Sequence, residues 1–160
     1  MQDMIKLLFI CHGNICRSPM AEFVMKDLIE KEGLSDCIFV ASAATSTEEL
    51  GNDIHYGTRS VLERYRIPFA RRQARQITRA DYGEYDYLVG MDSANIRNMQ
   101  RAFGGDPEGK VYKLLSFAGN GNDVADPWYT GDFETTYRDV QEGCQALLKR
   151  LKAELRGVRQ

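Results

Sequence analysis

The sequence predicts an α/β protein, built as one domain around an open parallel sheet with helices on both faces. Short apolar runs typical of buried strands alternate along the chain with amphipathic stretches typical of helices. The chain has 160 residues, 43% of them hydrophobic, which is enough for one core. No internal repeat, low-complexity tract or linker divides it. We therefore expect a single domain over residues 1–160.

The first half of the chain predicts two strands and two helices. Residues 4–10 (MIKLLFI) are almost continuously apolar, as expected of a central strand that is covered on both faces. Ser18 and Pro19 supply an N-cap and a first-turn proline for a helix over residues 19–32. Residues 37–43 (CIFVASA) indicate a second strand, and residues 56–65 a helix after a polar loop.

The second half repeats the alternation. Thr78 and Asp81 predict one short capped turn, and residues 85–91 (YDYLVGM) a third strand. Asp92 or Ser93 caps a helix that runs to residue 103, and residues 111–115 form a fourth strand. We expect a loop over residues 116–132. Apolar residues at three- and four-residue spacing then predict a long helix over residues 133–155.

The composition limits which binding partners and which cellular compartment we expect for the protein. Lys and Arg number 21 against 23 acidic residues, so the net charge of -2 gives no general reason to bind nucleic acid or an anionic membrane. No apolar stretch approaches the ~20 residues of a membrane span, and the start shows no basic leader with a cleavage site. We expect a cytoplasmic protein with free thiols, of which Cys37 and Cys144 are buried and inert.

The loop at residues 11–17 (CHGNICR) predicts a phosphate site. It joins the first strand to the first helix, at the sheet edge where α/β proteins bind ligands. Unpaired amides and the positive end of the helix dipole favour an anion there. Gly13 and Asn14 tolerate left-handed backbone conformations, so the loop can curl and direct several amides at one point.

Two side chains of this loop indicate a nucleophile and a phosphate ligand. Arg17 offers a planar fork for two phosphate oxygens, and its charge stabilises a thiolate at Cys11. The hydroxyl of Ser18 can donate a hydrogen bond to that thiolate. A C-x5-R-S pattern alone is weak, and its place between strand and helix favours the phosphate site over a merely structural loop. Metal binding by Cys11 and Cys16 lacks a second ligand pair, so we expect no metal and no cofactor.

A late loop, residues 124–129 (VADPWY), supplies a candidate acid. If Cys11 attacks phosphorus, the leaving oxygen needs a proton, which the carboxyl group of Asp126 can donate. Trp128 and Tyr129 are flat apolar walls suited to an aromatic leaving group. The structural alternative is that Asp126 and Pro127 form an ordinary turn and that the two aromatic residues only pack.

Five segments in this order, ICHGNICRSPMAE, SAATS, ARQIT, MDSAN and DPWY, resemble the low-molecular-weight protein tyrosine phosphatases over residues 5–151. The resemblance implies an open four-stranded parallel sheet in the order 2-1-3-4. It also implies metal-free hydrolysis of a phosphotyrosine protein or a small aryl phosphate by a monomeric enzyme. Cys11 would carry a phosphocysteine, Arg17 would bind the phosphoryl oxygens, and Asp126 would act as acid and then as base.

The same resemblance assigns the remaining site residues. Asn14 and Ser18 match residues that hold the loop and support the thiolate, and Cys16 matches a cysteine that bonds reversibly to Cys11 under oxidation. Tyr129 resembles a tyrosine that is phosphorylated in some members. The phosphate loop implied in this way comprises His12, Gly13, Asn14, Ile15, Cys16, Arg17 and Ser18.

Some positions depart from the family pattern. Glu48 takes a slot in the substrate cleft that is often aromatic, and its carboxylate cannot stack on a phenyl ring and repels acidic substrates. Arg72 replaces a common histidine, and we expect the basic cluster over residues 71–79 to be a solvated face that pairs with nearby acids. We expect His12 to contribute its backbone amide and His55 to face solvent in a loop.

Two rival functions remain open. An arsenate reductase of the same fold needs relay cysteines, and no cysteine lies between Cys37 and Cys144. A phosphate-ester binding module without turnover is the non-enzymatic alternative. The presence of Cys11, Arg17 and Asp126 together argues against it.

Overall fold

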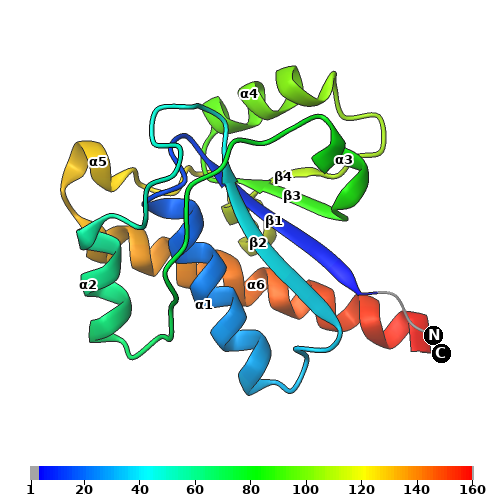
Figure 1. The fold of residues 1–160 in the computed structure, drawn as a ribbon. Coiled ribbons are helices and arrows are strands. Elements are labelled where there is room, and N and C mark those ends of the chain that lie inside the picture. Colours follow the sequence, from blue (N-terminus) through cyan, green and yellow to red (C-terminus); the bar gives the residue numbers. More distant parts are fainter. Residues whose placement is uncertain (1–3, 160) are drawn as a thin grey trace.

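A four-stranded parallel sheet forms the centre of the computed structural model, which describes residues 4–159 (Figure 1). The strand order is β2-β1-β3-β4, so the predicted α/β fold with the order 2-1-3-4 is confirmed. The strands are β1 (Ile5–Cys11), β2 (Ile38–Ala44), β3 (Tyr87–Gly90) and β4 (Val111–Lys113).

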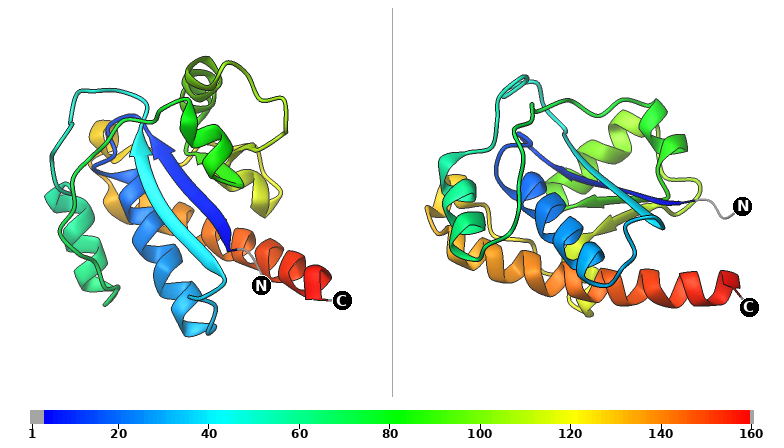
Figure 2. Two further views of the ribbon diagram at one scale, coloured as in Figure 1. Left: turned by 45° about the vertical axis from the view of Figure 1, so that its right-hand side comes forward. Right: turned by 60° about the horizontal axis from the view of Figure 1, so that its bottom comes forward.

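Helices cover both faces of the sheet (Figure 2). α1 and α6 lie against one face, and α3 and α4 lie on the other. The bounds are α1 (Arg17–Lys31), α2 (Tyr56–Arg64), α3 (Ala80–Glu84), α4 (Ser93–Phe103), the 3-10 helix η1 (Leu114–Ala118), α5 (Pro127–Thr130) and α6 (Phe133–Arg159).

Strand β1 divides the hydrophobic core into two layers. Leu7 and Phe9 belong to the cluster beneath α1 and α6, whereas Leu8 and Ile10 belong to the cluster beneath α3 and α4. This alternation follows from the two-residue period of a strand. All four side chains are fully buried, which explains why the run appears continuously apolar in the sequence.

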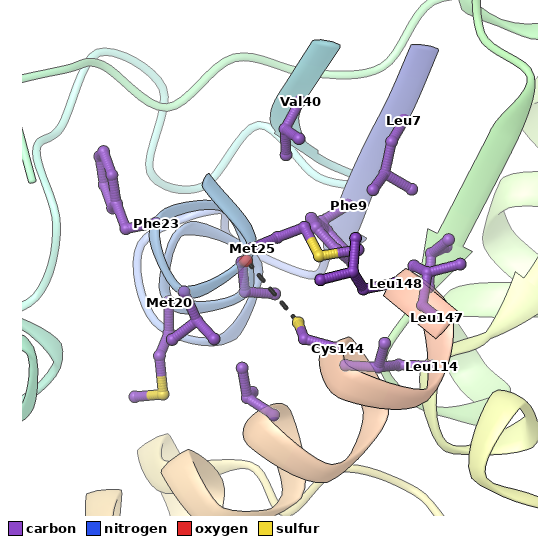
Figure 3. Packing of buried hydrophobic residues seen from close by; sticks show 14 of the residues in the cluster. Leu7, Phe9, Met20, Phe23, Met25, Val40, Leu114, Cys144, Leu147 and Leu148 are labelled. Atoms are coloured by element: carbon purple, nitrogen blue, oxygen red, sulfur yellow. Dashed lines mark hydrogen bonds between the residues drawn. The ribbon is translucent and has the colours of Figure 1, made fainter. Parts of the chain in front are cut away.

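Helix α6 packs closely on α1 and η1. Figure 3 shows Cys144, Leu147 and Leu148 of α6 facing Phe9 and Leu114, and the Cys144 thiol lies 3.8 Å from the carbonyl oxygen of Ala21. Cys144 is fully buried, as predicted. Cys37 is only half-buried, so its assignment as a buried thiol is wrong, because it precedes β2 at the amino end of the sheet.

Several predicted boundaries differ from the structure. α1 begins at Arg17, with Cys16 as its N-cap, so Ser18 is not the cap. The third and fourth strands are shorter than predicted, since β3 spans only four residues and Leu114–Ala118 turn into a 3-10 helix. The loop predicted over residues 116–132 contains the short helix α5, and α6 runs past residue 155. Within residues 4–159, no helix combines the length and apolar character needed to cross a bilayer.

The parallel arrangement brings three loops together at one edge. The Cα atoms of Cys11 and Ala44 are paired at the carboxyl ends of β1 and β2, and Ile10 is paired with Gly90 at the end of β3. The loops that follow these strands therefore leave the sheet side by side. Candidate site residues from distant parts of the sequence converge on this edge.

Gly143→Ala tests the close packing of α6. A Cβ atom at this position would lie 2.4 Å from the Cγ atom of Leu114, so we expect the free energy of unfolding to fall by about 1 to 3 kcal/mol. The matched control is Gly157→Ala on the same helix, where, apart from the adjacent residues and backbone of α6 itself, no atom of the described residues lies within 4 Å of the added methyl group. Urea unfolding should show no loss for the control. Equal stability of the two variants would contradict the close approach.

Candidate active site

Asn14 determines the shape of the loop between β1 and α1. Its φ angle is 60°, a left-handed conformation that is rare for residues other than glycine. The side chain, which is fully buried, donates from Nδ2 to the hydroxyls of Ser18 (2.8 Å) and Ser42 (2.9 Å). Its Oδ1 accepts a hydrogen bond from the amide of Arg75 at 3.3 Å. These three bonds hold the residue in the conformation that curls the loop.

The curled loop surrounds the sulfur of Cys11 with donors. The backbone N–H groups of Asn14 and Ser18 point at Sγ from 3.3 Å and 3.4 Å. The Ser18 hydroxyl lies 3.1 Å from the same sulfur, as the sequence predicted. Two backbone N–H groups and one hydroxyl therefore converge on this buried sulfur.

Arg17 is a buried cation that is held by two acids. Only 3% of its side chain is exposed. Nη1 donates to Asp92 Oδ2 at 2.8 Å and to the carbonyl of Val124 at 3.1 Å, and Nη2 donates to Asp126 Oδ2 at 3.3 Å. Burial opposes the charge, but the negative groups of Cys11, Asp126 and Asp92 outweigh it, so the pKa of Arg17 is raised.

Asp92 lines the cleft, whereas its sequence context predicted only a helix cap. It is the N-cap of α4, and it forms a capping box with Asn95. Its second carboxylate oxygen orients Arg17. The MDSAN segment marked the helix start, but no local signal indicated the partner of the arginine.

Asp126 reaches the phosphate loop from a segment 109 positions away from Arg17 in the chain. It is the N-cap of α5, since its Oδ1 accepts the N–H of Trp128 at 3.0 Å while its Oδ2 faces Arg17. Pro127 occupies the first turn, as expected from its fixed φ angle. The carboxyl group is therefore fixed in direction and still partly exposed.

A cleft of about 460 Å³ contains most of the residues that the sequence analysis placed in the site. Trp128 and Tyr129 lie on one side and are 63% and 85% exposed. Asn14 and Ser18 lie outside the lining, because both are buried behind the loop. The lining comprises Cys11, His12, Gly13, Ile15, Cys16, Arg17, Glu48, Glu49, Asp92, Ala94, Asn95, Asn98, Asp126, Trp128 and Tyr129.

The expectation for the basic cluster over residues 71–79 is correct for Arg75 and wrong for Arg72. Arg75 forms an ion pair with Asp81, with N–O distances of 3.1 and 3.2 Å. Arg72 instead points inward, where its guanidinium donates to the carbonyl oxygens of Asn14 (2.5 Å) and Asn52 (3.2 Å). Burial lowers its pKa. Arg72 thus supports the strained residue of the phosphate loop.

His55 also departs from its expectation. It is not a solvent-facing loop residue but the N-cap of α2, where Nδ1 accepts the N–H of Gly57 at 3.0 Å. Its ring is stacked on Phe133 (centroids 5.2 Å apart) and meets Trp128 edge-on at 6.0 Å. Its backbone N–H donates to the carbonyl of Ile15. His55 therefore connects the phosphate loop to the segment that carries Asp126.

The side chain of His12 has a partner that was not expected. Its Nε2 atom lies 3.0 Å from Oε2 of Glu48, at the mouth of the cleft, and both side chains are more than half exposed. Its carbonyl oxygen accepts hydrogen bonds from the amide and hydroxyl of Ser46. In the part of the chain that the structure describes, no three His, Cys, Asp or Glu side chains are arranged to hold a metal ion.

Three comparisons relate the chain to known proteins. A family model described as low molecular weight phosphotyrosine protein phosphatase matches residues 6–157. The low molecular weight protein-tyrosine-phosphatase YfkJ of Bacillus subtilis is 39% identical over 153 residues, covering 94% of this chain and 98% of the relative. PtpA of Staphylococcus epidermidis is 38% identical, with coverage of 91% and 92%.

The chain is also similar to solved structures of this kind of phosphatase. The crystal structure of YfkJ has a TM-score of 0.91 and 38% identity, and covers 95% of this chain and 97% of the other. The low molecular weight protein tyrosine phosphatase SP-PTP of Streptococcus pyogenes has a TM-score of 0.84 and 45% identity, with coverage of 92% and 93%.

The buried thiol of Cys16 predicts a specific alkaline instability. Burial, followed by the charges of Cys11 and Asp126, raises its pKa from 9.0 to about 12. The unfolded chain then loses this proton at lower pH than the folded one, so the contribution of Cys16 is complete below pH 9 and is lost as the pH rises toward 12.

Cys16→Ser removes this titration. Between pH 9 and 11 the free energy of unfolding of the variant should fall less steeply than that of the parent protein, by up to about 1.4 kcal/mol per pH unit. Urea unfolding at pH 8.5, 9.5 and 10.5 with reductant measures both slopes. Identical slopes would show that Cys16 ionises as readily in the fold as in the unfolded chain.

Proposed function

This chain belongs to the low molecular weight phosphotyrosine protein phosphatase family, and from that membership we propose that it hydrolyses protein phosphotyrosine or similar aryl phosphates through a phosphocysteine on Cys11. One observation carries the proposal. A donor-surrounded thiol, a buried guanidinium and a directed carboxyl group, from Cys11, Arg17 and Asp126, meet in one cleft. These are the groups that nucleophilic phosphoryl transfer without a metal requires.

In the first step, the thiolate of Cys11 attacks phosphorus. The P–S bond forms as the bond between phosphorus and the phenolic oxygen breaks, and Asp126 donates its proton to that oxygen. The loop amides and the positive end of α1 stabilise the charge on the phosphoryl oxygens. The aromatic leaving group lies between the loop and the side chains of Trp128 and Tyr129.

Arg17 changes partners during this step. In the structure Nη2 bonds to the carboxylate of Asp126, while Nη1 is held by Asp92. When Asp126 carries the proton that it will donate, it no longer attracts Nη2 as an ion, so that nitrogen becomes available to the phosphoryl oxygens. Asp92 keeps the guanidinium in place throughout.

In the second step, water hydrolyses the phosphocysteine. The carboxylate of Asp126 accepts a proton from the water, whose oxygen bonds to phosphorus as the P–S bond breaks. Inorganic phosphate leaves and the Cys11 thiolate is restored. The overall reaction consumes one water and involves no change of oxidation state.

Cys16 forms a reversible disulfide with Cys11 when an oxidant such as hydrogen peroxide has converted Cys11 to a sulfenic acid, releasing water. The cytoplasmic location and the monomeric state stay predictions from the sequence. The arsenate reductase alternative gains no support, because Cys37 lies at the opposite end of the sheet and Cys144 lies in the core.

Cys11→Ser tests the covalent step. Purified protein should hydrolyse para-nitrophenyl phosphate in the presence of EDTA, and the variant should lose activity by at least about a thousandfold, since a serine hydroxyl is not ionised at neutral pH. Cys37→Ser, at the far end of the sheet, is the matched control and should retain turnover. Hydrolysis by the Cys11 variant at the parental rate would exclude a phosphocysteine.

Asp126→Asn tests the general acid. Asparagine can still cap α5, so the loop keeps its geometry while the proton donor is lost. We expect kcat/KM for phenyl phosphate, a poor leaving group, to fall about 100-fold to 10,000-fold, and the value for 2,4-dinitrophenyl phosphate less than tenfold. Equal losses for the two esters would contradict a role in protonating the leaving group.

A further inference from the structure

The loop after β2 is fastened to the phosphate loop. The amide of Thr45 donates to the carbonyl of Cys11 at 2.9 Å, and the amide of Ser46 to that of His12 at 3.1 Å. The hydroxyl of Ser46 also donates a hydrogen bond to the carbonyl of His12 and accepts one from the backbone N–H of Glu48. The segment that begins the cleft rim is therefore held at a fixed place relative to the nucleophile.

Two carboxylates of this loop line the cleft. Glu49 lies directly over the phosphate loop, since a Cβ atom on Gly13 would come within 3.3 Å of its Cγ. Its Oε1 accepts a long hydrogen bond from the side-chain Nδ2 of Asn52 at 3.4 Å. The Glu48 side chain is largely exposed at the mouth, and its Oε2 lies 3.0 Å from the exposed ring of His12.

Some of the carboxylates that line the cleft have a basic partner and others do not. Asp92 and Asp126 both pair with Arg17. Glu48 and Glu49 have no lysine or arginine partner in the described part of the chain. Trp128 and Tyr129, whose exposed rings also line the cleft, carry no charge. The cleft lining of the described residues thus combines two carboxylates that lack a lysine or arginine partner with two exposed aromatic rings.

A phosphotyrosine that reaches Cys11 brings its polypeptide onto this rim. The phosphate already carries about two negative charges, so acidic residues beside the tyrosine add repulsion against Glu48 and Glu49. A lysine or arginine beside the tyrosine meets them as a counter-charge. We propose that Glu48 and Glu49 are specificity-determining residues that select phosphotyrosine sites flanked by basic residues. The inference rests on the proposed phosphatase activity and names its substrate class.

The expected size of the effect follows from the exposure of the rim. An exposed ion pair changes a rate or binding constant by about 1.5-fold to 5-fold, and salt screens it. With two carboxylates facing two substrate charges, we expect kcat/KM to be about 5-fold to 20-fold higher for a basic peptide than for an acidic one at low ionic strength. Rim charges act on association, so the preference should shrink at high salt.

Three phosphotyrosine peptides of one length test this, with lysine, glutamine or glutamate at the positions on either side of the tyrosine. The readout is the ratio of kcat/KM for the lysine and glutamate peptides, measured by phosphate release at 20 mM and 500 mM NaCl. Each enzyme serves as its own reference. The ratio in the parent protein should be 5 to 20 at 20 mM and approach about 2 at 500 mM.

Glu48→Gln and Glu49→Gln should each reduce the ratio about twofold or more, and the double variant should bring it close to 1. Glu30→Gln is the matched control, because it removes the same charge from an exposed position of α1 outside the cleft, and it should keep the parental ratio. A parental ratio near 1, or a ratio that the double variant leaves unchanged, would overturn the proposal.

The same assays distinguish a failure of the charge preference from a failure of the proposed phosphatase activity. If para-nitrophenyl phosphate is hydrolysed but the three peptides are turned over equally, only the charge preference is wrong. If neither para-nitrophenyl phosphate nor any peptide is hydrolysed, the phosphatase activity itself is wrong. A preference for the glutamate peptide would assign the opposite substrate class and equally overturn the inference.

Discussion

The left-handed backbone of Asn14 is the constraint on which the site depends. A non-glycine residue in this conformation costs on the order of 1 to 2 kcal/mol, and the curl that it produces turns two amides toward the sulfur of Cys11. Hydrogen bonds from both ends of the side chain offset this cost. The sulfur of Cys11 and the loop amides that face it acquire their relative positions from this one residue.

The parts of the fold that could be predicted are those whose signals are local. β1 is buried on both faces and therefore apolar throughout, and α6 carries an apolar stripe against α1, so both were visible as patterns. The loop from Cys11 to Arg17 could be placed at the ligand-binding edge because parallel strands end together. Composition and hydrophobic periodicity are sufficient to predict a strand or helix whose environment is uniform along its length.

The contacts that could not be predicted are those between residues far apart in the sequence. Arg17 bonds to Asp92, which is 75 residues away in the sequence, and Arg72 bonds to the carbonyl of Asn14, which is 58 residues away. In neither case do the residues adjacent in sequence indicate the partner. Arg72 belongs to a basic stretch that is typical of a solvated surface, and only the packing shows that it points inward. Ser18 illustrates a related conflict, since its residue type favours an N-cap, but its hydroxyl serves Asn14 and Cys11 inside the helix.

The burial of Arg17 restricts what evolution can place at that position. Its two terminal nitrogens bond to Asp92, to Val124 and to Asp126 in three different directions, with almost no contact with water. A lysine ammonium is a single point charge that is strongly hydrated, so it cannot serve these directions at once and would lose more solvation on entering the site. Conserving the charge is therefore not enough, and an inherited drift to lysine would leave Asp92 and Asp126 without the one cation that bonds to both.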